Sequence, residues 1–268
     1  MTRNAGLWLV AALVTVAAAM WQRASGPTHP VRGTVVVGGA SVQLRLLRSH
    51  GGEGGQPVRI AAADGALRGE VAYRRFPTDD PWTILPLARA GEWLEAELPH
   101  QPPAGKLEYQ VHLRHGDDET VFPPRPAVTR FKGEVPAWLL IPHVVAMFLG
   151  MLFSTRAGIE AAVNGPRLPR YALWTMTLIG VGGFLLGPAV QQAAFGVWWT
   201  GVPFGRDLTD NKTLLAGAAW AWAVLRMRGG RRARGAALAA ALLTLAIFAI
   251  PHSTWGSQLD WAAPPATS

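Results

Sequence analysis

Residues 137–155 read AWLLIPHVVAMFLGMLFST, a run without a single charged side chain. A helix needs about 20 mostly apolar residues to cross the hydrocarbon core of a bilayer, and this run approaches that length. Four further stretches share its character, and they cover residues 5–21, about 171–192, about 208–226 and about 236–255. The stretch at 208–226 begins with several polar side chains. The pattern predicts an integral membrane protein with five crossings, the last four of which form a helical bundle within residues 136–262.

The composition supports this prediction. The chain has 268 residues, of which 50% are apolar and only 16% are charged, whereas about a quarter of the residues of a soluble protein are charged. It contains no cysteine, which excludes a disulfide scaffold, thiol chemistry, iron–sulfur ligation and zinc-finger sites.

The basic surplus of the chain lies in short segments beside the predicted crossings. The formal net charge is +8, yet residues 22–135 contribute only +1 of it. Arg3, residues 156–170 and residues 226–234 together carry a net charge of +8, and the remaining loops carry −1. The positive-inside rule places such segments in the cytoplasm. The distribution removes the argument for nucleic-acid binding. It predicts a multi-pass protein of the bacterial inner membrane, with a cytoplasmic N-terminus and with residues 31–132 and the C-terminus in the periplasm.

Residues 1–22 fit two descriptions. Arg3, an apolar run over residues 6–20 and three consecutive alanines at 17–19 are typical of a transmembrane anchor and also of a secretory signal peptide. Both descriptions place the following segment outside the cytoplasm. We expect an uncleaved anchor, with cleavage as the alternative.

The sequence pattern of residues 31–132 predicts an all-β domain, which the expected topology places outside the cytoplasm. Apolar and polar residues alternate with a period of two at 42–46, 93–98 and 107–113, and more loosely at 58–60 and 71–74. Glycine, proline and aspartate pairs separate these runs. Short strands with turns at this spacing indicate a β-sandwich, so the expected fold class is an α+β membrane protein.

Two parts of the chain resemble known families. Residues 91–99 (GEWLEAELP), 103–105 (PAG) and 107–111 (LEYQV) resemble bacterial immunoglobulin-like or fibronectin-type-III-like extracytoplasmic domains, which implies a sandwich that binds or spaces. Residues 203–214 (PFGRDLTDNKTL) and 251–260 (PHSTWGSQLD) are similar to segments of uncharacterised bacterial inner-membrane proteins of this layout. That resemblance implies no activity.

These same two segments form the first candidate site. By the predicted topology both lie at the outer membrane boundary, where polar side chains are costly unless they are paired. The candidate residues are Asp207, Thr209, Asp210, Asn211, Lys212, His252, Ser253, Ser257 and Asp260. A purely structural alternative is that Thr209 or Asp207 caps the helix that begins there, while Lys212 pairs with Asp207 or Asp260 or extends outward. We expect some residue of 207–212 to contact some residue of 252–260, because a short turn at 226–234 predicts an antiparallel hairpin of the last two crossings.

The second candidate site lies on the crossing at 137–155. His143 lies about 9 Å below its outer end, and Met147 and Met151 follow on roughly the same helical face. An imidazole with thioethers suits copper(I), or haem if a second axial ligand such as His252 is present. The alternative is ordinary packing by the methionines and a hydrogen bond between helices by the histidine.

No motif of a hydrolase, P-loop protein, Rossmann protein or zinc protease occurs in the sequence. The sequence therefore favours a non-enzymatic membrane protein without a cofactor, acting as an accessory or scaffolding subunit of a larger respiratory, photosynthetic or secretory complex. Its expected partners are the lipid bilayer and other membrane subunits, and no nucleic acid. The alternative function is a copper- or haem-handling redox protein that uses His143, Met147, Met151 and His252.

Overall fold

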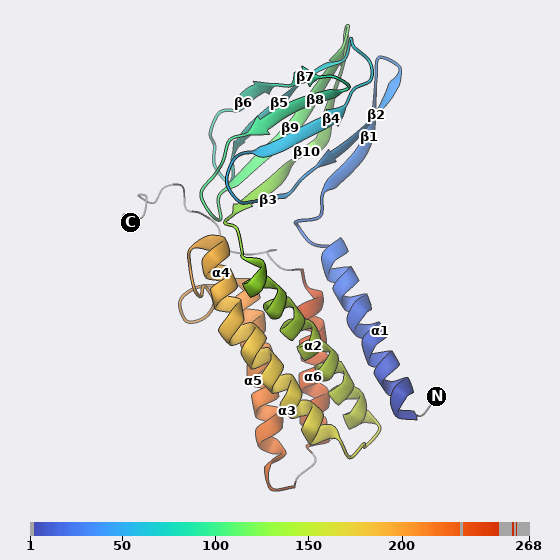
Figure 1. Ribbon diagram of the computed structural model, residues 1–268, viewed down its shortest axis with the longest axis vertical. Helices are drawn as coiled ribbons and strands as arrows, with labels where there is room; N and C mark the ends of the chain where they lie inside the picture. The colour runs from blue at the N-terminus through green and yellow to red at the C-terminus, as the bar shows by residue number, and fades with distance from the viewer. Residues whose placement is uncertain (1–2, 231–232, 252–258, 260, 262–268) are drawn as a thin grey trace. The chain divides into compact units, whose positions relative to one another are not determined.

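The computed structural model describes residues 3–230, 233–251, 259 and 261 (Figure 1). The chain divides into two compact units. The helical unit comprises Met1–Pro27 and Val135–Ser257, and the β unit comprises Thr28–Glu134 and Gln258–Ser268. The fold is therefore α+β, as the sequence predicts.

The helical unit contains six α-helices and two short helical segments of other types within its described residues. The helices are α1 (Arg3–Ala24), α2 (Ala137–Ala162), α3 (Leu168–Ile179), α4 (Gly187–Phe195), α5 (Leu208–Arg226) and α6 (Arg234–Ala249). A π-helical segment, Gly180–Leu186, joins α3 to α4, and a 3₁₀ turn, Arg228–Gly230, follows α5.

Three of the helical spans are long and apolar enough to cross a membrane: Arg3–Ala24, Ala137–Ala162 and the continuous Leu168–Phe195. These three spans indicate membrane association. The other two expected crossings do not reach this standard within the described residues. α5 begins with polar side chains, and α6 has 16 residues and ends at Ala249 rather than near residue 255. Pro251 explains the early end, because the residue before a proline avoids the helical conformation, and Ile250 is extended with ψ at 128°.

Two further helix boundaries differ from those predicted. α2 continues to Ala162 instead of ending near residue 155, and α3 begins at Leu168 instead of residue 171. The charged residues Arg156 and Glu160, which the sequence places in a loop, are buried in the last turns of α2. Their mutual pairing, described below, makes this longer helix possible.

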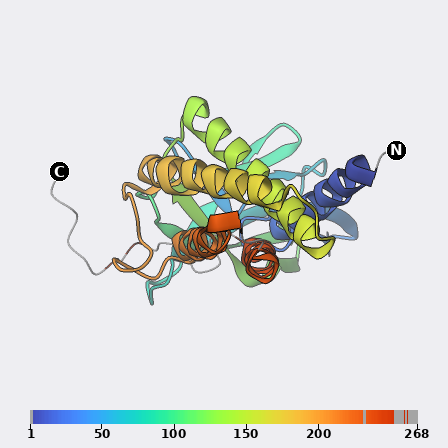
Figure 2. The same ribbon diagram turned by 90° about the horizontal axis from the view of Figure 1, so that it is seen from below.

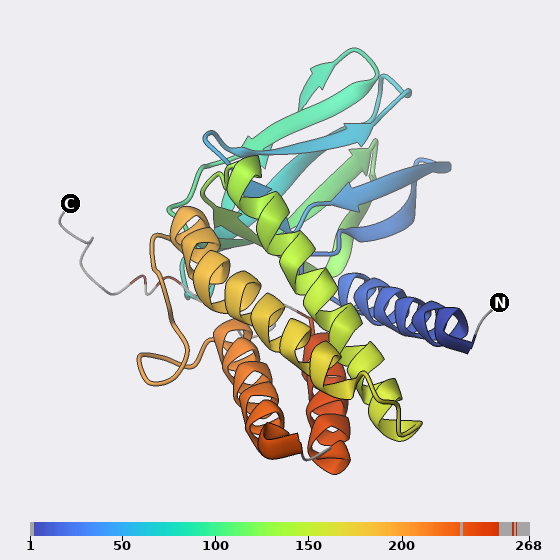
Figure 3. The ribbon, with the colours of Figure 1, turned by 60° about the horizontal axis from the view of Figure 1, so that its bottom comes forward.

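The four helical spans after α1 form a bundle, in which α2 and α3 face α6 and α5 (Figures 2 and 3). Alanine side chains dominate its core, and small side chains allow helices to approach closely. α5 and α6 pack as an antiparallel hairpin, as predicted, and the indole Nε1 of Trp220 donates to Thr244 Oγ1 at 3.0 Å between them. α1 packs against α2 and α6.

The described residues of the β unit form ten strands. They are β1 (Val31–Val37), β2 (Ala40–Leu46), β3 (Ser49–Gly51), β4 (Gln56–Ala61), β5 (Arg68–Arg75), β6 (Thr83–Pro86), β7 (Ala88–Ala90), β8 (Trp93–Leu98), β9 (Lys106–His115) and β10 (Asp118–Lys132). The five-stranded sheet has the order β3-β10-β9-β5-β6, a three-stranded sheet has the order β4-β8-β7, and β1 pairs with β2.

One hydrophobic core joins all three groups of strands, which gives the unit a sandwich-like arrangement. Val42, Leu44 and Leu46 of β2 alternate with exposed side chains, as the period-two pattern predicts. Polar side chains also lie in this core. Tyr109 donates to Leu47 O at 2.7 Å and accepts from Gln56, whose amide oxygen accepts from Thr129. Burial raises the pKa of Tyr109, so the phenol remains a neutral donor.

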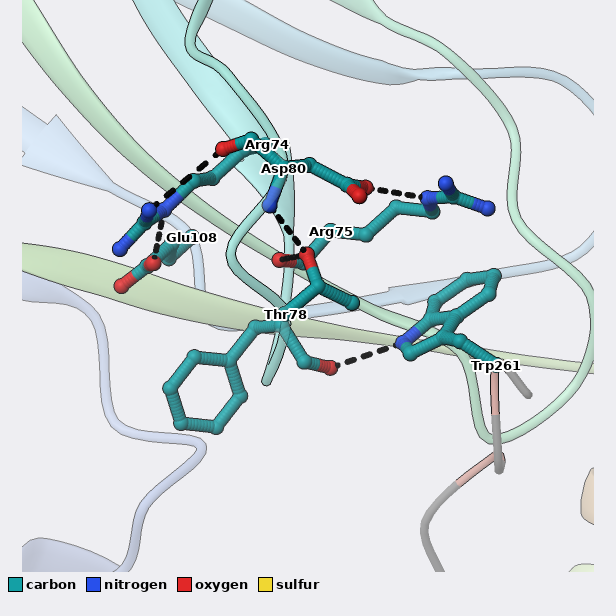
Figure 4. Close-up of polar contacts among 7 residues, drawn as sticks. Arg74, Arg75, Thr78, Asp80, Glu108 and Trp261 are labelled. Carbon is teal, nitrogen blue, oxygen red and sulfur yellow. Dashed lines mark hydrogen bonds and ion pairs between the residues drawn. The ribbon is translucent and has the colours of Figure 1, made fainter.

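A polar cluster fixes the turn that follows β5 (Figure 4). Arg74 bonds Glu108, its cross-strand neighbour on β9, at 2.6 Å, and Arg75 bonds Asp80 at 2.6 Å. This ion pair lowers the pKa of Asp80. The indole of Trp261 donates to Phe76 O at 3.1 Å, and the guanidinium of Arg75 lies 5.2 Å from the Trp261 ring centre. A residue near the C-terminus thus packs on the same turn.

Candidate functional site in the helical unit

A cavity of about 380 Å³ lies within the helical unit. Its volume falls in the range of small-molecule sites, about 300–1,000 Å³. One side of the cavity is formed by α2, which contributes Leu140, His143, Val144, Met147, Phe148 and Met151. The other walls come from α1 (Ala19, Gln22 and Arg23), α4 (Val190), α5 (Thr209 and Thr213) and α6 (Phe248). Five helices from distant parts of the sequence therefore form this site, which we call the bundle cavity.

His143 is held in one orientation by the π-helical segment. Its Nδ1 lies 2.9 Å from the carbonyl oxygen of Gly182, which also accepts the backbone N–H of Gly187. A carbonyl oxygen can only accept, so Nδ1 carries the proton and Nε2 is the acceptor of the neutral ring. This arrangement fixes the tautomer in the way that metal-binding histidines are commonly fixed. π-Helical turns occur frequently at functional sites.

Met147 and Met151 line the same cavity as His143, as their spacing of four residues predicts. Met147 packs closely on the π-helical segment. A Cβ atom added at Gly182 would lie 3.0 Å from the Met147 sulfur, so a glycine at this position makes room for the thioether. Three of the four proposed metal ligands thus share one cavity, and the fourth, His252, lies outside the described residues.

One part of the cavity wall is polar. Arg23 lies in the last turn of α1, and its side chain is exposed. Gln22 beside it donates to Phe248 O at 2.7 Å, which ties α1 to α6. Thr209 and Thr213 contribute hydroxyl groups from α5. The cavity therefore combines a mostly apolar lining with a guanidinium group.

The polar stretch at 207–212 is used mainly to fix the loop before α5. Asp207 caps α5, because its carboxylate accepts the backbone N–H groups of Thr209 and Asp210. Asp210 accepts Thr200 N at 2.6 Å and Gly201 N at 3.0 Å, and Asn211 accepts Val202 N at 2.8 Å. A Cβ added at Gly201 would lie 2.7 Å from Asp210 Cβ, so a glycine permits this close approach. The cap by Asp207 belongs to the structural alternative that the sequence left open, whereas the loop contacts of Asp210 and Asn211 were not predicted.

Lys212 is buried, with 1% of its surface exposed, and it pairs with the end of α6. Its ammonium group donates to the carbonyl oxygens of Ile250 and Pro251, the latter at 3.2 Å. A cation is favourable at a helix C-terminus, where backbone carbonyls lack partners. The expected contact between residues 207–212 and residues 252–260 stays a prediction, because His252, Ser253, Ser257 and Asp260 lie outside the described residues.

α2 contains a buried ion pair that the sequence does not predict. Arg156 and Glu160 of α2 are 1% and 4% exposed, and their side chains lie 2.6 Å apart. The Arg156 guanidinium also donates to Asn4 of α1 and lies 4.7 Å from the ring centre of Tyr171. Glu160 accepts the backbone N–H of Arg167 at 3.1 Å. The available signal was the spacing of four residues between opposite charges, which places them on one helical face.

Among the residues that the structure describes, no three histidine or acidic side chains converge in a way that could hold a metal ion. A metal in the bundle cavity would therefore depend on methionine sulfur beside His143.

Comparison with known proteins adds no assignment. A scan against protein-family models, a search of curated proteins and a search of solved structures each find no match to this chain. The two family resemblances noted in the sequence stay predictions.

Proposed function

We propose that this protein is a non-enzymatic integral membrane protein whose bundle cavity binds an amphiphile with one apolar chain and an acidic headgroup, such as a fatty acid. The observation that carries the proposal is the combination of Arg23 with an otherwise mostly apolar lining in one cavity of about 380 Å³. The apolar wall accommodates the chain, and the guanidinium group pairs with a carboxylate.

The headgroup decides the selectivity in this proposal. An acyl chain is already in an apolar medium within a bilayer, so moving it into the cavity gains little hydrophobic free energy. Arg23 pairs with no acidic side chain among the described residues, which leaves its charge available for a ligand. Because the group is exposed, we expect its contribution to be modest, about 0.2–1 kcal/mol.

Photo-crosslinking in lipid nanodiscs tests the proposal. The full chain is incubated with a diazirine-bearing palmitate, and labelled residues are identified by mass spectrometry. We expect labelling on α2 at Met147, Phe148 or Met151, with competition by palmitate about 1.4- to fivefold better than by palmityl alcohol. Arg23→Gln should remove that preference.

Two adjacent residues provide a matched control for occupancy. Val144 lines the cavity, whereas Val145 is exposed and does not line it. Val144→Trp fills the cavity and should abolish labelling of α2, whereas Val145→Trp should leave it unchanged. Equal labelling of both variants, or equal competition by acid and alcohol, would reject the proposal.

A second candidate function is favoured by one observation, the convergence of His143, Met147 and Met151 on the bundle cavity. With Nδ1 engaged, His143 Nε2 and the two sulfurs form a soft ligand set that suits copper(I). Metal analysis and optical spectra of protein expressed with copper or haem precursors test this candidate. Colourless protein without stoichiometric copper or iron would remove it. Copper that disappears in both Met147→Leu and Met151→Leu would support it.

The place of the protein in the cell is part of the same proposal. The arginine-rich segments at 156–170 and 226–234 support a bacterial inner-membrane protein with a cytoplasmic N-terminus and a periplasmic β unit. A cysteine introduced at Gly230 should then resist impermeant thiol reagents in intact cells, while one at Gly52 of the β unit should react. The reverse pattern would invert the topology.

An accessory or scaffolding role in a larger membrane complex is compatible with a bundle that holds a ligand. Native electrophoresis from mild detergents tests this role. Migration as a lone 28.7 kDa chain in every mild detergent would reject it.

A further inference from the structure

The β unit has a groove of its own, on the outer face of the sandwich. Its volume is about 700 Å³, and it follows the line where β2 lies beside β4. Within the described residues β2 pairs only with β1, and β4 pairs with β8, so no hydrogen-bonded ladder connects β2 to β4. The inward side chains of both strands contribute to one core, which keeps the two edges together. We call this feature the seam groove.

Two arginines face each other in the seam groove. Arg32 of β1 and Arg45 of β2 are directly opposite in the strand register, and both are exposed and line the groove. Like charges in directly opposite positions destabilise a strand pair. Neither side chain pairs with an acidic residue among the described residues. The described part of the chain therefore leaves this pair of cations unbalanced, and an anion between them would relieve the repulsion.

An aromatic side chain lies on the other side of the groove. Trp93 of β8 is 44% exposed and lines the groove with Arg59 of β4. The guanidinium of Arg59 lies 5.3 Å from the Trp93 ring centre and bonds Glu95 at 2.6 Å. This pairing holds Arg59 against the indole and leaves Arg32 and Arg45 as the available cations. Gln43 and Thr34 add an amide and a hydroxyl to the lining.

We propose that the seam groove binds an acidic saccharide, with its carboxylate or phosphate group between Arg32 and Arg45 and a sugar ring against Trp93. An indole face packs on the apolar face of a sugar ring, and an amide and a hydroxyl can bond its hydroxyl groups. Planar guanidinium groups bind carboxylate and phosphate in a bidentate manner.

A peptide strand inserted between β2 and β4 fits the seam groove less well than an acidic saccharide does. An added strand needs about 4.7–4.9 Å on each side, so its two neighbours must stand about 9.5 Å apart. Cα atoms of β2 and β4 approach within 8 Å of each other, which leaves no room for a strand at that point. A ligand that lies on the outer face needs no such separation.

Calorimetric titration of the full chain in nanodiscs of neutral lipid tests this proposal. The probes are hexaguluronate, a carboxylated hexasaccharide, and maltohexaose, a neutral one. We expect hexaguluronate to bind about tenfold more tightly or better, with an affinity that falls as salt rises. Arg45→Gln should weaken binding of hexaguluronate about two- to fivefold, and the double variant Arg32→Gln/Arg45→Gln should weaken it further.

The control variant is Arg125→Gln, which removes an exposed arginine of β10 that does not line the groove. It should bind hexaguluronate like the unaltered chain. Trp93→Leu should weaken binding at unchanged salt dependence, because it removes the stacking face and no charge. Folding of each variant is verified by thermal unfolding, and since Arg45 is exposed and repelled by Arg32, we expect Arg45→Gln to fold.

Three outcomes would overturn the proposal. Equal binding of the two hexasaccharides would show that charge plays no part. Equal weakening by Arg45→Gln and Arg125→Gln would show that binding is not located in the groove. Binding of hexaglutamate as tight as that of hexaguluronate would show a site for acidic peptides or polyanions in general.

Discussion

Charged side chains of two contrasting kinds occur in this protein, and the clearest examples of each come from different units. In the helical unit Arg156, Glu160, Asp210 and Lys212 are almost fully buried, and each is bound to a partner within the chain. In the β unit Arg32 and Arg45 are exposed and stand opposite each other, and no acidic side chain among the described residues pairs with either. A buried charge must be paired, because its desolvation is costly. An exposed charge carries no such requirement and can bind something else.

The comparison separates structural charges from candidate binding groups. The stretch at 207–212 is a candidate site in the sequence because it is polar and lies near a predicted membrane boundary. In the structure its side chains form hydrogen bonds with the preceding loop and with the end of α6. Arg23, Arg32 and Arg45 are less conspicuous in the sequence, and these are the groups that line cavities without an acidic partner among the described residues.

Loss of one partner in the Arg156–Glu160 pair should reduce stability more than any other substitution proposed for this protein. Glu160→Leu leaves Arg156 charged and buried, so we expect it to lower the free energy of unfolding of the helical unit by about 3–5 kcal/mol. Denaturant unfolding in detergent, followed by tryptophan fluorescence, measures the loss.

The control for this prediction removes both charges. Arg156→Met/Glu160→Leu should lose less stability than Glu160→Leu alone, since two apolar side chains of similar volume leave no unpaired charge. A double variant less stable than both single variants would mean that contacts such as that of Arg156 with Tyr171 outweigh the ion pair.

Removal of the Asp210 carboxylate should have the next largest effect. Asp210→Ala leaves the backbone N–H groups of Thr200 and Gly201 without their acceptor, and hydrogen bonds to charged groups contribute about 1.5–3 kcal/mol each. We expect hydrogen exchange at residues 199–202 to lose about 2–4 kcal/mol of protection.

Asp207→Ala provides the comparison variant for Asp210→Ala. It removes a helix cap, which is worth about 1 kcal/mol, and it leaves the Asp210 contacts in place. Protection at residues 199–202 should therefore change little. If Asp210→Ala also left this loop protected, the loop-fixing role of Asp210 would be wrong.

Local patterns predicted much of the fold. Alternation at 42–46, 93–98 and 107–113 predicted β2, β8 and β9, because the side-chain period of a strand is visible in a few residues. The end of α2 was not predictable in this way. Arg156 and Glu160 read as loop charges until Asn4 and Tyr171, from distant parts of the sequence, show how they are buried.

The bundle cavity was likewise predictable only in part, because local patterns do not show which distant helices meet. The face of α2 with His143, Met147 and Met151 was predictable from helical spacing. Arg23 lies 120 residues before His143 in the chain, and Phe248 lies 105 residues after it. No local signal indicates that they meet, because only tertiary packing brings them together.

Lys106 tests an intermediate case, a half-buried charge in the β unit. Burial, with a contribution from Arg130 directly opposite on β10, lowers the pKa of Lys106 from 10.5 to about 8. The unfolded chain therefore binds more protons than the folded chain between about pH 8 and 10.5, and the stability of the β unit should rise with pH over that window. Lys106→Met should raise stability at pH 7 by about 1 kcal/mol, after allowance for solvent screening.

The pH dependence distinguishes this effect from a gain in packing. The advantage of Lys106→Met should shrink as the pH rises from 8 towards 10.5, because the folded lysine is then neutral and the unfolded lysine binds progressively fewer protons. Denaturant unfolding at pH 7, 9 and 10.5 measures it. An advantage that stays constant over this range would be due to the methionine side chain rather than to the lost charge.

Relief of the repulsion between Arg32 and Arg45 should change the free energy of unfolding least. It should stabilise the β unit, whereas the substitutions at Glu160 and Asp210 destabilise the helical unit. Arg45→Thr removes one of two opposed like charges, and threonine favours strands, so we expect the β unit to gain about 0.2–1 kcal/mol. Arg32→Thr should produce a similar gain.

The double variant should gain less than the sum of the two, because either substitution alone already removes the repulsion. This shortfall should diminish at 1 M salt, where the Debye length is only about 3 Å. Gains that simply add, or that do not depend on salt, would mean that the two guanidinium groups do not repel each other, and the seam groove would then lack the charge imbalance that makes it a site for anions.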